Sequence, residues 1–129
     1  MNEVLATATA KTVVTPQLTA NSMGSGSLAV FATPGMCALM EQAATMALQE
    51  KLSDGQTSVG TALNIEHVSA TPVGMAVYAK ADLLEFNGKV AKFTIEAYDE
   101  AGLIGKGTHS RVVVNSARFM EKTEGKMAK

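Results

Sequence analysis

The chain has 129 residues, of which 47% are apolar, and a net charge of −1 that results from 11 basic and 12 acidic side chains. This length predicts a single domain over residues 1–129, with enough apolar side chains for one core. The basic residues are scattered along the chain, which argues against the concentrated basic face of a nucleic-acid-binding protein. A single cysteine excludes an internal disulfide bond and fits a reducing compartment.

The N-terminus has no basic start followed by an apolar run, so the sequence indicates no secretory signal peptide. The most apolar segment falls about five residues short of the roughly 20 that cross a bilayer. No group of cysteines and histidines has the spacing of metal ligands. We therefore expect a cytoplasmic protein that needs no metal ion or other cofactor and has neither nucleic acid nor membrane as a partner.

Two segments precede the most apolar part of the chain. Residues 2–14 alternate between apolar residues and Thr or Lys, which predicts a strand, and Pro16 ends it because proline cannot donate to a β-ladder. Residues 17–27 are rich in small and polar residues and predict a loop. Because this loop leads into a helix, it is either a lid over the helix start or a plain connector.

A long apolar helix is predicted over residues 33–48. Thr33 suits the N-cap and Pro34 the first helical position, and strong helix formers follow. A helix that is apolar on nearly every side must be covered by other structure. Its one carboxylate, Glu41, lies among apolar neighbours, where ionisation is costly, so it is a candidate for chemistry. The alternative is a structural ion pair with a buried arginine such as Arg111.

The remainder of the chain predicts an antiparallel sheet. Asn87-Gly88 is the strongest hairpin signal, since both turn positions need φ > 0. Alternating patterns predict strands at residues 57–70, 74–86, 89–98 and 103–115. The charged tail at 116–129 predicts either a short surface helix or a frayed end.

The predicted order is one strand, a long helix and four strands in a meander. One long apolar helix against one antiparallel sheet is an α+β arrangement, and a sheet of about five strands that curves around such a helix is a hotdog fold. Hotdog domains commonly form dimers, because one wrapped sheet leaves an open edge. We therefore expect a homodimer.

The two histidines differ in context. His67 shares a strand face with Leu63 and Ile65, which predicts that it points toward the helix, in either a functional or a structural role. His109 lies between polar Thr108 and Ser110, which favours a surface or structural role.

A set of short motifs in the same order resembles the fluoroacetyl-CoA thioesterase family of hotdog proteins. The set runs from about residue 30 to 113 and comprises VFATPGM at 30–36, LME at 39–41, GTA at 60–62, His67, ATP at 70–72 and GKGTHSR at 105–111. The resemblance implies that Thr33, Glu41 and His67 form the catalytic set. It also implies that Gly60 and Arg111 contact the substrate, an acyl group carried by coenzyme A or by acyl carrier protein.

These residue types suit thioester hydrolysis. The N–H groups of Gly35 and Met36, at the positive end of the helix dipole, are expected to hold the developing oxyanion. Glu41 is expected to activate water or to attack the thioester directly, and His67 to carry the proton. Thr33 positions the acyl group or the water, acts as the nucleophile, or serves only as a cap.

Thr33 and Glu41 are eight positions apart, roughly 12 Å along one helix, so they cannot easily reach the same thioester carbonyl from one chain. We therefore predict an acyl-CoA thioesterase whose site combines residues of two chains at a dimer interface. The structural alternative for Gly60 is that it only relieves a strand crossing.

The segment before the helix bears on the identity of the acyl group. The fluoroacetyl-specific member of the family has an aromatic-rich segment there, whereas residues 21–27 hold no aromatic side chain. We therefore expect a small or short-chain acyl group other than fluoroacetyl. Two other functions remain open. One is a non-catalytic acyl-CoA-binding or sensing protein, which has no need for both Glu41 and His67. The other is a hotdog hydratase or dehydratase, for which no motif is present around Asp82 or Asp99.

Overall fold

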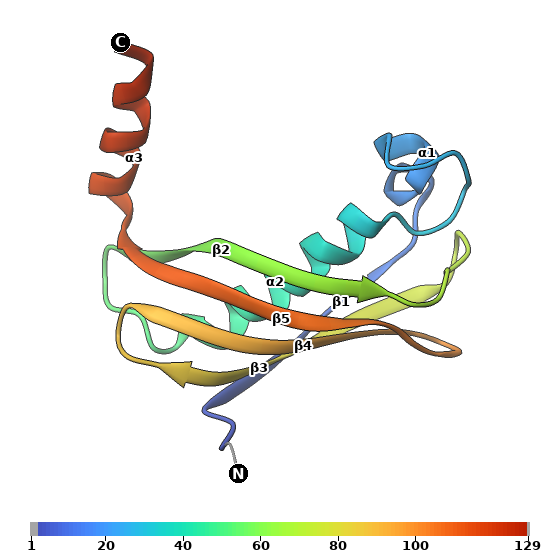
Figure 1. The fold of residues 1–129 in the computed structure, drawn as a ribbon, viewed down its shortest axis with the longest axis horizontal. Helices are drawn as coiled ribbons and strands as arrows, with labels where there is room; N and C mark the ends of the chain where they lie inside the picture. Colours follow the sequence, from blue (N-terminus) through green and yellow to red (C-terminus); the bar gives the residue numbers. More distant parts are fainter. Residues whose placement is uncertain (1–2, 129) are drawn as a thin grey trace.

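A long helix packed on one face of an antiparallel sheet dominates the computed structural model, which describes residues 3–128 (Figure 1). The helix, α2, spans Thr33–Gln49, and the sheet has five strands. The strands are β1 (Ala6–Val13), β2 (Gln56–His67), β3 (Ala76–Phe86), β4 (Val90–Asp99) and β5 (Gly102–Asn115). The predicted α+β class and the hotdog arrangement are confirmed.

The strand order is β1-β3-β4-β5-β2, and every neighbouring pair is antiparallel. The predicted meander is correct for β3, β4 and β5 but wrong for β2, which pairs with β5 at the sheet edge. The segment 68–75 is too long for a tight hairpin, and it crosses the start of α2, where the Phe31 N–H donates to the Thr71 carbonyl at 2.8 Å. This crossing leaves the end of β2 next to the start of α2.

Small residues on the sheet allow α2 to lie close to it. The inner faces of β3 and β4 bury Val77, Ala79, Ala81, Leu83, Phe93, Ile95 and Ala97. On α2 the buried side chains form a stripe with helical spacing, which consists of Met36, Leu39, Met40, Ala43, Ala44, Ala47 and Leu48. The opposite flank is open, since Met46 is 45% exposed. Within one chain the sheet therefore covers only one side of the helix.

The start of α2 differs from the prediction in one functional respect. The N-cap residue is Ala32 rather than Thr33, and no side chain caps the helix. Thr33 is the first helical residue and Pro34 follows in the first turn, where its missing N–H has no helical acceptor to lose. The N–H of Ala32 donates to the Leu18 carbonyl at 2.8 Å, which ties the helix start to the preceding segment. The hydroxyl of Thr33 is thus not used for capping.

The segment before α2 is more ordered than the predicted loop. It forms a 3-10 turn at Pro16–Leu18 and a short helix, α1, at Ala20–Met23. Thr19 precedes α1, and its hydroxyl oxygen accepts from the Ser22 N–H at 3.4 Å. The strand predicted at residues 2–14 is shorter in the structure, where β1 begins at Ala6, and residue 2 lies outside the described residues.

The C-terminal segment forms the surface helix that was one of its two predicted states. This helix, α3 (Ser116–Glu124), is followed by a 3-10 turn at Gly125–Ala128. The Asn115 side chain accepts from the Arg118 N–H at 2.9 Å and caps α3. No residue of α3 is buried, and the helix projects away from the sheet (Figure 1).

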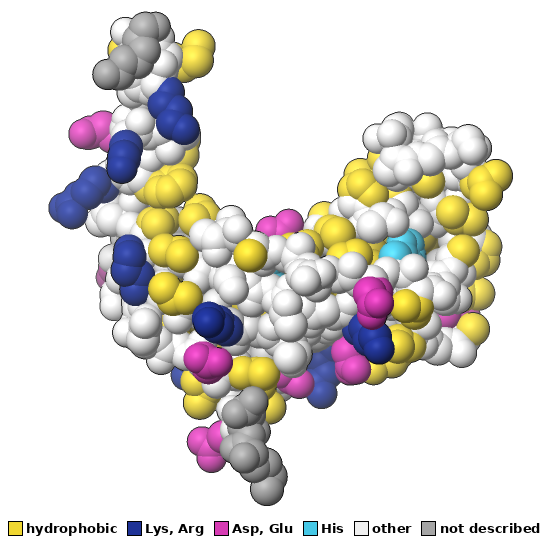
Figure 2. Space-filling model, viewed as in Figure 1, with side chains coloured by type: hydrophobic (Ala, Val, Ile, Leu, Met, Phe, Trp, Pro, Cys, Tyr) yellow, Lys and Arg dark blue, Asp and Glu magenta, His cyan; other side chains and the backbone are white. Residues whose placement is uncertain are grey.

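Figure 2 shows that the molecule is hollowed between the α3 and α1 arms, above the β2 edge. No helix of the described residues is long and apolar enough to span a membrane.

Candidate active site

Thr33 and His67 meet where the start of α2 lies next to the end of β2. The Thr33 Oγ1 atom is 2.8 Å from His67 Nδ1, although the two residues are 34 positions apart. The prediction that His67 points toward the helix is confirmed by this contact. The explanation of Thr33 as a mere N-cap is wrong, because Ala32 occupies that position and the hydroxyl is directed at the imidazole.

The other ring nitrogen of His67 has no hydrogen-bond partner among the described residues and is buried. Burial lowers the pKa of His67 from its ordinary value of 6.5, an effect that the nearby backbone of Ser69 partly opposes. The imidazole is therefore neutral near pH 7, with one nitrogen that accepts and one that donates. His67 and Thr33 line a pocket of about 300 Å³ together with Ala20, Ser25, Val30, Phe31, Val68, Ser69 and Ala70. An unpartnered buried nitrogen beside an open pocket is suited to a ligand.

The backbone N–H groups at the helix start differ in availability. The Met36 N–H donates to the Ala32 carbonyl at 3.0 Å, so the prediction that Met36 holds an oxyanion is contradicted. The Met36 side chain is fully buried against Gly105, where an added Cβ would lie 2.5 Å from its sulphur. Gly35 is one residue earlier, among the first N–H groups of a helix that have no intrahelical acceptor. Of the two predicted donors, only Gly35 remains.

Glu41 lies in a second cluster, about two turns farther along α2. Its Oε2 atom is 3.6 Å from Arg111 Nη1, so the geometry of the alternative ion pair is present. The Glu41 side chain is 44% exposed and ion-paired, which corrects the expectation of a purely apolar environment. Gly60 makes this placement possible, because an added Cβ at Gly60 would lie 2.6 Å from Glu41 Oε2. The strand register shifts between Gly60 and Ala62, and this bulge turns Gly60 toward the carboxylate.

The Arg111 guanidinium is held on several sides. Its Nε donates to Ser58 Oγ at 2.8 Å, and its Nη2 donates to the Ser58 carbonyl at 3.0 Å. Burial lowers the pKa of Arg111, which the charge of Glu41 opposes, and the group remains cationic at any physiological pH. The side chain is only 8% exposed, so its remaining nitrogen, Nη1, is directed at Glu41 by fixed contacts.

His109 belongs to the same cluster and was missed by the sequence analysis. It is 3% exposed, which contradicts a surface position, and its Nδ1 is 2.7 Å from the Ala62 carbonyl. A carbonyl only accepts, so Nδ1 carries the hydrogen and Nε2 accepts from Arg111 Nη1 at 3.3 Å. Burial lowers the pKa of His109, and the Arg111 charge lowers it further, so the ring is neutral. One sequence signal could have placed it: in a strand, His109 lies on the same face as Arg111 and Val113.

The structure therefore brings the predicted residues together as two groups. Thr33, His67 and Gly35 lie at the start of α2, and Glu41, Gly60 and Arg111 lie farther along it. Thr33 and Glu41 are eight positions apart on α2, a rise of roughly 12 Å. One chain does not join the two groups around a single carbonyl.

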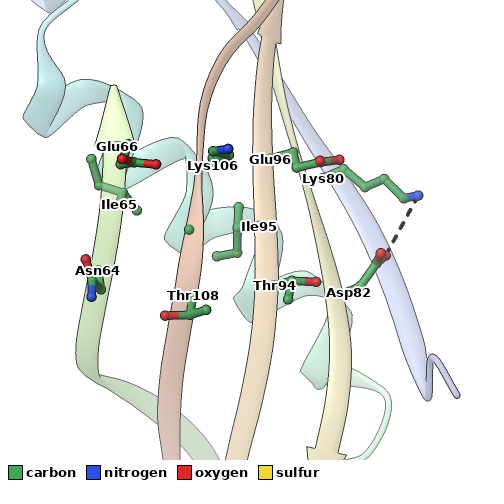
Figure 3. A pocket seen from close by; sticks show the side chains of 11 residues that line it. Asn64, Ile65, Glu66, Lys80, Asp82, Thr94, Ile95, Glu96, Lys106 and Thr108 are labelled. Atoms are coloured by element: carbon green, nitrogen blue, oxygen red, sulfur yellow. Dashed lines mark ion pairs between the residues drawn. The ribbon is translucent and has the colours of Figure 1, made fainter. Parts of the chain in front are cut away.

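A hollow of about 670 Å³ lies elsewhere, on the outer face of the sheet (Figure 3). Glu66, Lys106, Glu96 and Lys80 are in register across four strands there and alternate in sign. Opposite charges on adjacent strands stabilise each other. None of the predicted site residues lines this hollow, and the charge pairing gives it a structural explanation. No group of three or more His, Cys, Asp or Glu side chains in residues 3–128 is placed to hold a metal ion.

Comparisons with known proteins show what the chain is similar to. A family described as fluoroacetyl-CoA-specific thioesterase matches residues 14–117. The chain is 38% identical over 97 residues to a fluoroacetyl-CoA thioesterase of Streptantibioticus cattleyicolor, which covers 75% of this chain and 70% of that protein. A solved structure of the fluoroacetyl-CoA thioesterase FlK matches 96% of each chain with 35% identity and a TM-score of 0.88. A variant of that enzyme in complex with fluoroacetate and CoA matches 91% of this chain and 98% of the variant, with 33% identity and a TM-score of 0.84.

Proposed function

The chain belongs to the fluoroacetyl-CoA-specific thioesterase family, and we propose that it hydrolyses a small or short-chain acyl-CoA thioester at a site shared by two copies of the chain. Membership of this family makes it a thioester hydrolase and favours catalysis over non-catalytic acyl-CoA binding. The observation that carries the proposal is the 2.8 Å contact between Thr33 Oγ1 and His67 Nδ1 beside a small pocket. A pure binding protein has no need for a hydroxyl held against a neutral imidazole.

Hydrolysis requires that water adds to the thioester carbonyl and that the departing thiolate receives a proton. Glu41 is the base that accepts the proton of the attacking water. The neutral His67 ring accepts this proton on Nε2, which has no partner among the described residues, and releases it to the thiolate, while Nδ1 stays hydrogen-bonded to Thr33 Oγ1. The Gly35 N–H, at the positive end of the α2 dipole, stabilises the oxyanion. The products are a carboxylic acid and the free thiol.

Gly60 and Arg111 form the acyl end of the proposed site. Gly60 leaves space beside the Glu41 carboxylate that any side chain would fill, since even a Cβ would lie 2.6 Å from Oε2. Arg111 is buried and charged, and it fixes the direction in which Glu41 points. The acyl carbonyl is thereby held close to the base that activates water.

A homodimer is proposed because one group lies at the start of α2 and the other at its middle. β2 is an edge strand of 12 residues, and the flank of α2 that carries Ala38, Gln42 and Met46 is exposed. Pairing of two β2 edges about a two-fold axis would place two α2 helices antiparallel and cover both surfaces. In such a dimer Glu41 of one chain works with the partner subunit's Thr33 and the partner subunit's His67.

The acyl group is proposed to be small and not fluorinated. The pocket at Thr33 and His67 has a volume of about 300 Å³, which limits the chain length. The Streptantibioticus cattleyicolor relative is named as a fluoroacetyl-CoA thioesterase, whereas residues 21–27 of this chain contain no aromatic side chain to surround such a group. We place the enzyme in the cytoplasm, where its single cysteine stays reduced.

The test is an assay of the purified protein with acetyl-, propionyl-, butyryl- and fluoroacetyl-CoA, with detection of the released thiol. We expect turnover of at least one unfluorinated substrate, with fluoroacetyl-CoA not preferred. The His67→Ala variant, prepared in the same way, controls for contaminating hydrolases. Tight binding of acyl-CoA without any turnover would replace this proposal with a binding or sensing function.

A further inference from the structure

A third hollow lies at the base of α3, away from both groups of site residues. It has a volume of about 450 Å³ and is lined by Gln56, Gly88, Lys89, Val113, Val114, Asn115, Arg118, Phe119 and Lys122. Three of these residues are cationic and none is acidic. Figure 2 shows the basic side chains that gather along the α3 arm. The overall charge of the chain is −1, so this local excess is not a general property of the surface.

The cations of this hollow have no acidic side chain among the residues that line it. Arg118 and Lys122 are four positions apart on α3, which places two like charges on the same helix face. Lys89 joins them because the Val113 N–H donates to its carbonyl at 2.8 Å and holds the β3–β4 hairpin against β5. Among residues 3–128 none of the three forms an ion pair. A bound anion would remove this repulsion.

Phe119 adds a second kind of contact. It is 38% exposed, and it lies between the two cations in the sequence of α3. A half-exposed aromatic ring next to cations suits a planar base attached to phosphates, since bases stack on aromatic faces. The volume of the hollow falls in the range of small-molecule sites, whereas an acidic protein partner would contact a broader surface.

The hollow is connected to the proposed active site by one pair of strands. Gly60 is opposite Arg111, and Gln56 is opposite Asn115, on the same β2 and β5 strands. Four strand residues span roughly 13 Å. The pantetheine arm of coenzyme A, which is a chain of two amide-linked segments, is long enough to bridge this distance between the thioester and the nucleotide.

We propose that Lys89, Arg118, Phe119 and Lys122 at the base of α3 bind the phosphorylated adenosine end of coenzyme A. The proposal rests on the acyl-CoA thioesterase activity proposed above and specifies how the carrier is recognised. The three cations contact the phosphates, and Phe119 stacks on the adenine. The site thus distinguishes a CoA thioester from a thioester on a simple thiol.

The test compares two substrates that share an acyl group, the CoA thioester and the N-acetylcysteamine thioester, which lacks the nucleotide. The R118A/K122A double variant is expected to raise KM for the CoA thioester about tenfold or more with kcat unchanged. Its KM for the N-acetylcysteamine thioester should equal that of the wild type. Lys126→Ala, a charge removal farther along the C-terminal segment, is the matched control and should change neither. Equal effects on both substrates, or none on the CoA thioester, would overturn the proposal.

Calorimetric titrations with CoA, dephospho-CoA and adenosine 3′,5′-bisphosphate measure binding without catalysis. They distinguish a failure of this inference from a failure of the catalytic proposal. We expect the double variant to lose affinity for CoA and for the bisphosphate. If the protein binds CoA through these residues but hydrolyses nothing, the subsite stands and the catalytic proposal fails. If the wild type does not bind CoA, or if only acyl carrier protein depends on the cations, the subsite is refuted.

Discussion

His109 holds Arg111 in the orientation that directs it at Glu41. The His109 Nε2 atom accepts from Arg111 Nη1 at 3.3 Å, and the same Nη1 is 3.6 Å from Glu41 Oε2. Because Nδ1 of His109 is anchored to the Ala62 carbonyl at 2.7 Å, the ring cannot rotate without losing both contacts. The position of the Glu41 carboxylate therefore depends on His109, although no hydrogen bond joins these two side chains.

Removal of this acceptor should reduce catalysis. The His109→Leu variant leaves a buried N–H of Arg111 without a partner, and we expect kcat to fall about tenfold or more, with a smaller change in KM. His109→Gln keeps an acceptor of similar reach and should retain more activity. Steady-state kinetics on both variants, with circular dichroism to verify folding, tests this. Identical kcat values for the two variants would show that the acceptor is not needed.

The stability of the protein should depend on pH through its two histidines. Burial lowers the pKa of His67 and of His109 below the unfolded value of 6.5. Between the folded and unfolded pKa values the unfolded state binds more protons, so the free energy of unfolding falls as the pH decreases below about 6.5 and is constant above it. Urea denaturation at several pH values between about 5 and 8 measures this. His109→Gln should show a smaller loss, and an identical pH profile would contradict the assignment.

Gly60→Ala should displace the carboxylate of Glu41, the proposed base. The added Cβ would lie 2.6 Å from Glu41 Oε2 and 3.2 Å from the His109 ring, so Glu41 must move. We expect kcat/KM to fall at least tenfold, on the scale of a misplaced catalytic group. Gly60 does not have a positive φ, so the backbone accepts alanine. Gly125→Ala, with nothing within 4 Å of its Cβ and no positive φ, is the matched control and should behave as the wild type.

Substitution of Thr33 distinguishes a capping role, which would affect stability, from a catalytic role, which would affect kcat. A lost N-cap side chain costs about 1 kcal/mol, but the N-cap here is Ala32. Thr33→Val should therefore change the free energy of unfolding by less than about 0.5 kcal/mol and reduce kcat about 10²-fold. Thr33→Ser keeps the hydroxyl and should retain most activity. Mass spectrometry of a trapped reaction is the additional readout, and an acyl group on Thr33 would make it the nucleophile.

Glu41→Gln and His67→Ala should each lower kcat about 10²-fold or more, as expected for lost acid–base groups. Wild-type rates in both variants would refute their assignment.

Complementation tests whether the site is shared between chains. Thr33→Val and Glu41→Gln are each expected to be nearly inactive alone. A mixed dimer of the two has one site with both wild-type residues, so refolding an equal mixture should restore about a quarter of the wild-type activity. A mixture as inactive as its components, with subunit exchange verified by mass, would place both residues in one chain.

Local patterns in the sequence were sufficient for the helices, the strands and the fold class, but not for the strand order. The helix at 33–48 follows from continuous helix formers, and the β3–β4 hairpin follows from Asn87-Gly88. The inward direction of His67 follows from strand alternation, because a period of two fixes the face once a strand is established. These features depend on neighbours in the chain, which the sequence displays directly.

Tertiary structure alone decided the details of the site. The crossing at 68–75 sends β2 to the far edge and brings His67 to Thr33, so the hydroxyl is used for the imidazole instead of a cap. The bulge after Gly60 and the register of β5 determine that Glu41, Arg111 and His109 converge. Such contacts join residues far apart in the chain, and their geometry depends on register shifts and packing that no local pattern encodes.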